Sequence, residues 1–541
     1  MNRPVLARLL SLALAALLCG CTSLRATRSE EADRTQPLAQ AAADPAGTAQ
    51  ALTRQDTPAS LPSLLLVSVG SEGLRAQPVD PHTLDALPGY TPFDLQHHYV
   101  HAVSPDGRTL AAITWPGGAG SGGMLHLLDL ASWTDQTPGV TIDDQVDTLT
   151  FSQDGKELYW ARPTRHDPAH GMPRAYELYR YDLGSRTVSV VTKLPPTFIP
   201  WWKETHLLAS GERLAIYGIP VDANDLSEDA PHVLIVNLNA GRIAVDIRLD
   251  GVRAGQFRDE QASGAAPGYR MYTPGLAWDR VRDLLYVVHA DADRVTVVDL
   301  AQGAVLKQAE VRPKLSLWER AGGWLVGVAE AKMIPGTERR VALSLDGTRL
   351  YAVGLRAEAA QQADGTWIGG ETPLGLQLIA TDDLSELRRL DLPVSDVALS
   401  PDGRRLLLSG AQERSRSGSA AERTGNGLYL LDADRLEQLA HLQPGVEYSI
   451  QGFSPDSRYA YLTYSVSSQS GRCGDQKAVY QTLELPSGRV VAAHESPGCF
   501  MGEVLTIGAA PQMAPNTDNC TFGRHLGSTI PVTCYNPSPL F

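Results

Sequence analysis

Short apolar runs separated by polar turns recur along most of this chain. Val397–Gly410 is the clearest example, because an apolar run enters Ser400-Pro401-Asp402-Gly403 and a second apolar run follows two arginines. In such a turn the proline presets φ, the aspartate bonds to nearby backbone, and the glycine accepts a positive φ. The pattern therefore predicts a β-hairpin.

The same turn chemistry recurs at intervals of about 55 residues, which is the spacing of a repeat built from several strands. The strong copies pair a serine with an aspartate two positions later, and they begin at Ser104, Ser152, Ser344, Ser400 and Ser454. Weaker copies lie at Ser210 and Trp278. Because each repeat has room for four strands with visible alternation, the sequence predicts an all-β propeller of four-stranded blades.

The two ends of the repeat region predict how the ring closes. Before the first repeat, Leu64–Val69, Leu74–Val79 and Thr83–Leu87 provide three strands, and after the last one Gly502–Ile507 provides a single strand. We expect these strands to complete an eighth blade, since closure removes the open edges that invite aggregation. A seven-bladed disc with extra flanking strands is the alternative.

These repeats resemble the SPDG-type and YVTN-type propeller blades, which are relatives of WD-repeat blades and occur in many exported bacterial proteins. The resemblance covers roughly Leu64 to Ala510. It implies a propeller fold, and it implies little about function, because such blades occur in scaffolds, binding proteins and a few enzymes.

The N-terminal region predicts export and lipid anchoring. Residues 1–20 carry Arg3 and Arg8 before an apolar run that is too short to span a membrane, which is typical of a signal peptide. The run ends at Leu18-Cys19-Gly20-Cys21, which resembles a bacterial lipoprotein cleavage box; the resemblance implies that Cys21 is lipidated and that the protein faces the periplasm or the exterior. Thr22 after the cysteine points to the outer membrane in a cell with two membranes. A plain secretory signal cut nearby is the alternative.

The rest of the chain divides into three predicted regions. Residues 21–60 are poor in large apolar side chains, which is typical of a flexible tether. Residues 61–510 form the propeller, and residues 511–541 form a C-terminal tail.

Loop lengths predict which face of the propeller binds other molecules. If the strands of a blade are labelled A to D, the A–B and C–D turns lie on one face and are short. The B–C and D–A connections lie on the other face, and the long ones are Arg162–Ala175, Ile219–Pro231, Arg356–Pro373, Ala411–Asn426, Val466–Gln476, Gly251–Arg270 and Arg312–Thr337. Long surface loops are where function concentrates. We call the two sides the tight-turn face and the long-loop face.

Histidine and tryptophan residues are the candidate ligand-binding groups of the long-loop face. The histidines are His97, His98, His101, His166 and His170, with Asp167 between the last two. Imidazoles and carboxylates are reasonable metal ligands, but loop histidines bonded to backbone or water are the simpler interpretation, so a metal stays undetermined. Trp201 and Trp202, together with Trp318 and Trp324, are expected either to line a ligand cup or to pack between blades. Asp259 and Glu260 are expected to be a solvated pair.

Charge and motif content exclude several classes of function. The formal net charge is −14, and no basic stripe with aromatic residues appears, so a nucleic-acid surface is not expected. The chain has no Gly-x-Ser-x-Gly, His-Glu-x-x-His or Ser-x-x-Lys motif, and Gly117–Gly123 lacks the lysine of a phosphate loop. No cofactor and no catalytic residue are therefore assigned.

The remaining cysteines suit an oxidising compartment. Cys473, Cys499, Cys520 and Cys534 all lie late in the chain, and four thiols allow three pairings. Because Cys473 and Cys499 belong to the same face and the other two bracket the tail, the favoured pairing is Cys473–Cys499 and Cys520–Cys534.

Two classes of function remain. The first is a membrane-anchored binding or scaffold module that holds a protein, glycan or small ligand on its long-loop face. The second is an enzyme with a site at the mouth of the central channel, such as a lactonase-like hydrolase or a metal-dependent oxidoreductase.

Overall fold

The computed structural model divides the chain into two units, residues 1–46 and 47–541, and all the residues it describes lie in the second. It describes residues 62–507 with gaps at 71–72, 97, 116–121, 137–139, 143–145, 147–148, 164–174, 209, 223–225, 260–267, 312–335, 362–366, 417–421, 467–476, 486 and 498–502. Every regular element in this described part is a β-strand. None of its residues forms a helix with the length and apolar character needed to cross a membrane.

The described strands form an all-β propeller of four-stranded antiparallel blades, which confirms the predicted fold class. The innermost strands are β4 (His98–Val103), β9 (Thr150–Phe151), β13 (Phe198–Leu207), β19 (Gly275–Asp279), β23 (Gly336–Leu343), β28 (Asp396–Leu399), β32 (Ser449–Phe453) and β36 (Glu503–Thr506). The second strands are β5 (Thr109–Trp115), β10 (Glu157–Pro163), β14 (Arg213–Pro220), β20 (Leu284–Val288), β24 (Arg349–Gln361), β29 (Arg405–Arg416), β33 (Tyr459–Val466) and β1 (Leu64–Gly70).

The outer half of each blade completes the same order. The third strands are β6 (Gly123–Asp129), β11 (Tyr176–Asp182), β15 (His232–Asn237), β21 (Arg294–Asp299), β26 (Leu376–Ala380), β30 (Glu422–Asp432), β34 (Lys477–Glu484) and β2 (Gly73–Pro78). The outermost strands are β7 (Thr134–Asp135), β12 (Thr187–Lys193), β16 (Arg242–Arg248), β22 (Ala304–Glu310), β27 (Glu386–Leu390), β31 (Gln438–Leu442), β35 (Arg489–Pro497) and β3 (Phe93–Gln96). The short β8 (Thr141–Ile142) pairs with β6.

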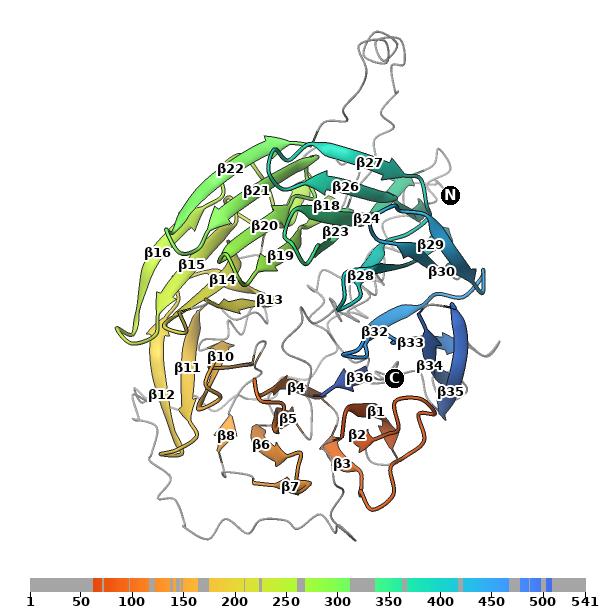
Figure 1. The fold of residues 1–541 in the computed structure, drawn as a ribbon. Coiled ribbons are helices and arrows are strands. Elements are labelled where there is room, and N and C mark those ends of the chain that lie inside the picture. The colour runs from red at the N-terminus through yellow and green to blue at the C-terminus, as the bar shows by residue number, and fades with distance from the viewer. Residues whose placement is uncertain are drawn as a thin grey trace, which may run out of the picture. The chain divides into compact units, whose positions relative to one another are not determined.

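The core lies between blades. Each apolar cluster of the described residues combines side chains from two neighbouring sheets, and Leu65, for example, packs in one cluster with Ala112 and Trp133. Figure 1 shows the two sheets concerned, β1–β3 and β4–β7, next to each other. The outermost strands β12, β16 and β22 are mostly exposed or half-buried. Hydrophobic burial between neighbouring blades is therefore what holds the sheets together.

The Ser–Asp turns are nearly identical in all five strong copies. The serine Oγ donates to the aspartate Oδ1 at 2.6–2.8 Å and accepts the backbone N–H five residues later at 2.9 Å. The glycines have the positive φ expected for the turn, for example 71° at Gly403. At the last copy Ser457 takes that position with a φ of 58°. The local sequence favours these turns because the serine and the aspartate bond to each other and to backbone within five residues.

The two ends of the described part share one sheet. Strand β36 pairs antiparallel with β1, so the sheet runs in the order β3-β2-β1-β36, while each of the other blades takes its described strands from one stretch of chain. Leu64, Tyr461 and Val504 pack in one cluster, which joins this sheet to the β32–β35 blade.

One predicted strand of this sheet is wrong. Thr83–Leu87 is not a strand, because Asp80 accepts hydrogen bonds from the backbone of His82 and Thr83 and the chain turns at the buried Leu84, whose φ is 60°. Strand β3 takes its place beside β2.

Three of the predicted long loops contain strands. Strands β17 (Gly255–Asp259) and β18 (Gly268–Thr273) form a hairpin within the predicted loop Gly251–Arg270, and β18 pairs in parallel with β23. Strand β25 (Trp367–Pro373) pairs with the extension of β24 and with β29, whose own extension pairs with β30. We call β17, β18, β25 and the extensions of β24, β29 and β30 the canopy. Strand β23 joins β18 to β24, so these segments belong to one continuous sheet on the long-loop face.

Candidate functional site

Most of the candidate residues chosen from sequence lie outside the described residues or only have a described backbone. His97, His166, His170, Trp318, Trp324 and Glu260 are outside, as are Cys21, Cys473, Cys499, Cys520 and Cys534. His98, Trp201, Trp202 and Asp259 have described backbones within β4, β13 and β17. His101 is half-buried on β4, the innermost strand of its blade, and not in a loop. No group of three His, Cys, Asp or Glu side chains among the described residues is placed to hold a metal ion.

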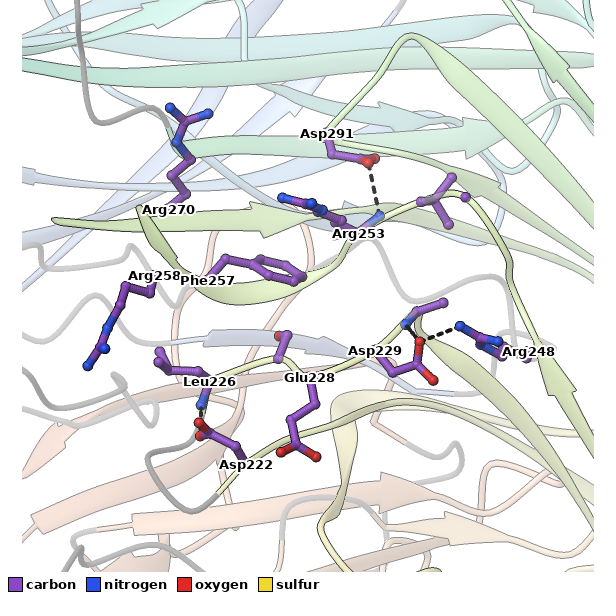
Figure 2. Close-up of a pocket in the computed structure, with 14 residues that line it drawn as sticks. Asp222, Leu226, Glu228, Asp229, Arg248, Arg253, Phe257, Arg258, Arg270 and Asp291 are labelled. Atoms are coloured by element: carbon purple, nitrogen blue, oxygen red, sulfur yellow. Dashed lines mark hydrogen bonds and ion pairs between the residues drawn. The ribbon is translucent and has the colours of Figure 1, made fainter. Parts of the chain in front are cut away.

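A pocket lies on the long-loop face between the β13–β16 and β19–β22 blades. Its volume is about 950 Å³. Its wall comes from the B–C connection at 222–230, the end of β16, the D–A segment 251–258, Arg270 on β18, and Asp291 in the turn between β20 and β21. We call it the Phe257 pocket (Figure 2). Every one of these connections belongs to the face that the loop lengths single out.

One wall of the pocket is aromatic and basic. Phe257 on β17 is half-buried, and the Arg253 guanidinium lies 5.4 Å from its ring centroid, within the range of a cation–π contact. Tyr272 on β18 supports the same ring at 6.0 Å between centroids. Arg258 is exposed and Arg270 lies opposite Phe257 across the hairpin. This wall offers a flat apolar surface bordered by guanidinium groups.

The opposite wall is acidic. Asp222 accepts a hydrogen bond from the backbone of Leu226 at 2.9 Å, and this bond closes the loop that carries the wall. Asp229 accepts from its neighbour Ala230 and forms a 2.5 Å ion pair with Arg248. The backbone N–H of Ala230 and the Arg248 guanidinium hold the pKa of Asp229 below its usual value, so this carboxylate is ionised. Glu228 is exposed between them and enters no ion pair with a described residue.

Two polar atoms of the lining have no hydrogen-bond partner among the described residues. Asp291 Oδ2 accepts the backbone N–H of Arg253 at 2.9 Å, whereas its Oδ1 is buried and unpaired. Burial raises the pKa of Asp291 above its usual value. Ser227 Oγ is likewise unpaired, in a side chain that is 8% exposed. Buried polar atoms without partners are uncommon, and each one costs free energy until a ligand or water satisfies it.

The turn that carries Asp291 is held by a neutral histidine. His289 is fully buried, and its Nε2 lies 2.8 Å from Thr296 Oγ1. Burial lowers the pKa of His289 to about 3, so the ring is uncharged at neutral pH. Gln308 donates to the same threonine at 3.0 Å. The arrangement fixes the shape of the blade beneath the pocket.

A second histidine has neighbours arranged like a hydrolytic triad but is structural. His126 Nε2 lies 3.1 Å from Thr114 Oγ1, and its Nδ1 lies 2.8 Å from Asp135 Oδ2. Thr114 is fully buried within the β4–β7 blade, so no substrate reaches its hydroxyl. Because a substrate cannot reach Thr114, the arrangement around His126 is not a catalytic site.

The pocket residues carry little local signal in the sequence. Gly251–Arg270 was identified as a long loop, but nothing in its sequence distinguishes Arg253 or Phe257 from ordinary surface residues. They become candidate binding residues only because two blades bring three connections together. The useful signal was the uneven distribution of loop lengths between the two faces.

Comparisons with known proteins do not assign a family. No family model and no curated protein matches the chain. Among solved structures, it is similar to dihydro-heme d1 dehydrogenase NirN in complex with DHE, with a TM-score of 0.46, 14% identity, and coverage of 84% of this chain and 78% of that one.

Two further structures are similar over most of their own length. An oligogalacturonate lyase in complex with manganese has a TM-score of 0.38 and 14% identity, and the match covers 80% of this chain and 98% of that one. A β-propeller domain from Myceliophteria thermophila has a TM-score of 0.33 and 12% identity, with coverage of 75% and 97%. The structures reported at this level of similarity thus include two enzymes and one β-propeller domain.

Proposed function

We propose that this chain is an exported, lipid-anchored propeller that binds a ligand on its long-loop face, in the Phe257 pocket. The observation that carries the proposal is the pocket itself. It combines a half-buried aromatic ring with charged groups and two unpaired buried polar atoms. Concave sites with a few convergent polar groups on an otherwise rigid frame are typical of ligand binding.

The proposed frame is a ring of eight blades. The sheet formed by β36 and β1–β3 packs on both sides, against β4–β7 through one apolar cluster and against β32–β35 through another. Extra strands that flank a seven-bladed disc would need only one of these contacts. Both contacts support counting this sheet as a blade.

A ligand screen tests the pocket. A library of small anions, oligosaccharides and short peptides is added to the purified protein, and the melting temperature is measured for each compound. A compound at 100 times its Kd stabilises the folded state by about 2.7 kcal/mol, which is easily detected. We expect the shift to disappear in Phe257→Ala.

The matched control for this screen is Val281→Ala, which truncates a side chain that is 90% exposed in an A–B turn on the tight-turn face. It is expected to keep every shift. If all active compounds stabilise Phe257→Ala as strongly as the wild type, or if no compound binds, the pocket is not the functional site. A compound that is chemically converted during the experiment would favour the enzyme class instead.

The proposed anchor rests on the sequence around Cys21. We expect the wild-type protein to enter the detergent phase of a phase partition, and Cys21→Ser to remain in the aqueous phase or keep its signal peptide. Aqueous partitioning of the wild type would contradict lipidation. The proposed Cys473–Cys499 and Cys520–Cys534 disulfides are tested in the same preparation by non-reducing peptide mapping.

A further inference from the structure

The charges of the Phe257 pocket are separated into two walls. Figure 2 shows Arg253 and Arg270 above Phe257, and Asp222 and Glu228 from the 222–230 connection below it. Arg258 lies at the side of Phe257, and its guanidinium is level with Leu226. The connection also carries Asp229, whose charge is matched by Arg248. A ligand in this pocket therefore meets positive charge on one side and negative charge on the other.

Some of these charges are still available to a ligand. Arg258 and Glu228 are both exposed, and neither forms an ion pair or side-chain hydrogen bond with any described residue. The Arg253 guanidinium is held over the Phe257 ring at 5.4 Å, where it keeps its N–H donors. The pocket thus presents a cation and an anion that have no partner in the described part of the protein.

A ligand of single charge fits this arrangement poorly. A simple anion would be attracted to Arg258 but would lie near the carboxylates of Asp222 and Glu228. A simple cation would be attracted to these carboxylates but would lie near the Arg258 guanidinium. In a partly desolvated pocket such a like-charge contact is unfavourable. A ligand that carries both charges gains from both walls.

The apolar surface and the size narrow the ligand further. Phe257 offers a half-buried apolar surface to the ligand. A volume of about 950 Å³ is at the upper end of the range for small-ligand sites, so it has room for more than one amino acid. We propose that the Phe257 pocket binds a short peptide with free termini, its ammonium group toward Glu228 and Asp222, its carboxylate toward Arg258, and an apolar side chain on Phe257.

This inference rests on the proposed binding function, and its test uses three related probes. Alanyl-phenylalanine, its N-acetyl derivative and its C-terminal amide are titrated into the purified full-length protein by calorimetry at pH 7 and low salt. We expect the dipeptide to bind, and each blocked derivative to bind about tenfold more weakly, which corresponds to about 1.4 kcal/mol. Added salt is expected to weaken the dipeptide most, because it uses both charged contacts.

Two substitutions assign the two ends of the peptide. Arg258→Gln should weaken the dipeptide and the N-acetyl derivative while leaving the amide unchanged. Glu228→Gln should weaken the dipeptide and the amide while leaving the N-acetyl derivative unchanged. Arg108→Gln, an exposed arginine in the first Ser–Asp turn, is the control and should change none of them.

The outcomes separate this inference from the proposed site. If the blocked derivatives bind as well as the dipeptide, if both substitutions act alike on all three probes, or if none of the probes binds, the zwitterionic peptide is the wrong ligand. The pocket itself still stands if compounds of another class lose their stabilising effect in Phe257→Ala. If no compound depends on Phe257, both proposals fail.

Discussion

The tight-turn face and the long-loop face of this propeller are built by different means. On the tight-turn face, a serine and an aspartate two residues apart satisfy each other and the nearby backbone, and the same bonds recur with nearly the same lengths in five turns. On the long-loop face, strands from different blades pair with one another, and the polar atoms Asp291 Oδ1 and Ser227 Oγ lack partners. The first face is determined locally and the second by tertiary contacts.

The difference suggests that the two faces have different roles. The Ser–Asp bonds within each turn can repeat from blade to blade, so they keep the blades uniform, and a few bonds such as Asp402 N–H to Ser457 Oγ join neighbouring turns. The canopy depends on its neighbours, and its outer edges are covered by short segments: Ser227 N–H donates to Gln256 on β17, and Gly445 N–H donates to Gly425 on β30. Covered edges protect a sheet from pairing with other molecules. The tight-turn face keeps the blades regular, and the long-loop face carries the pocket.

The largest effect is expected at the canopy edge. In Gly425→Ala the new Cβ would overlap the backbone of Val446 and Glu447, which cannot move away as a flexible side chain would. Overpacking of this kind costs about 1–3 kcal/mol or more, so the midpoint of denaturant unfolding should fall clearly. Gly184→Ala, in an exposed turn of the tight-turn face where the new Cβ approaches only Asp182 at 3.4 Å, is the control and should be close to neutral. Equal effects would mean that the canopy edge is not tightly packed.

The next largest loss of folding stability is expected in a single Ser–Asp turn. Ser400 is 1% exposed, and Ser400→Ala removes the acceptor of the Arg405 N–H and the donor to Asp402. Leaving a buried donor unpaired costs about 1–3 kcal/mol. Ser210→Ala provides the comparison, because the exposed Ser210 makes only a 3.4 Å contact with the Glu212 N–H. A thermal unfolding series in which the two substitutions have the same effect would show that the strong turns are no more important than the weak ones.

A fall in pH should change the stability contributed by carboxyl groups in opposite directions on the two faces. Hydrogen bonds from Ser104 and Ser344 hold the pKa of Asp106 and Asp346 below the usual 3.8, so their contribution to stability is present above about pH 4 and is lost as the pH falls through the lowered values. Burial raises the pKa of Asp291, so its contribution is present below pH 3.8 and is lost as the pH rises through the raised value.

Melting temperatures measured from pH 2.5 to 7 check both signs. Asp346→Asn should be less sensitive than the wild type to acid below pH 4, because it has one fewer carboxylate to protonate. Asp291→Asn should gain most over the wild type at neutral pH, and the gain should shrink as the pH falls. If the Asp291→Asn difference grows toward acid instead, then Asp291 is stabilised as a carboxylate and its unpaired oxygen carries no cost.

The smallest effect is expected at a surface ion pair between blades. Arg349 lies 2.9 Å from Asp434 on the tight-turn face, and the Asp434 side chain is 76% exposed. Exposed pairs of this kind contribute about 0–1 kcal/mol. Asp434→Asn should therefore move the melting temperature little, and less in high salt. A large loss would show that interblade ion pairs matter on this face as well.

The same difference explains what the sequence could predict. The Ser–Asp turns are predictable because each is encoded within about ten neighbouring residues, and the propeller follows from their repetition. Strand β25 was missed because Trp367–Pro373 contains two glycines and little alternation; it is a strand because β24 and β29 pair with it on both sides. The pocket was located only as far as the face, since Phe257, Glu228 and Asp291 come from three separate connections.

The pairing of β36 with β1 has a consequence for how the protein is made. Val67 accepts a hydrogen bond from Tyr480, a residue 413 positions away, and it lies opposite Glu503 in the sheet. Contacts of such sequence separation form late, because a long loop must close before they are gained. While the chain emerges from N- to C-terminus, β1 has to wait for almost the whole polypeptide before its neighbour arrives. Strand β2 can pair with one edge of β1 early, but until β36 arrives the other edge of this apolar strand stays open, and this interval is where a chaperone would be needed most.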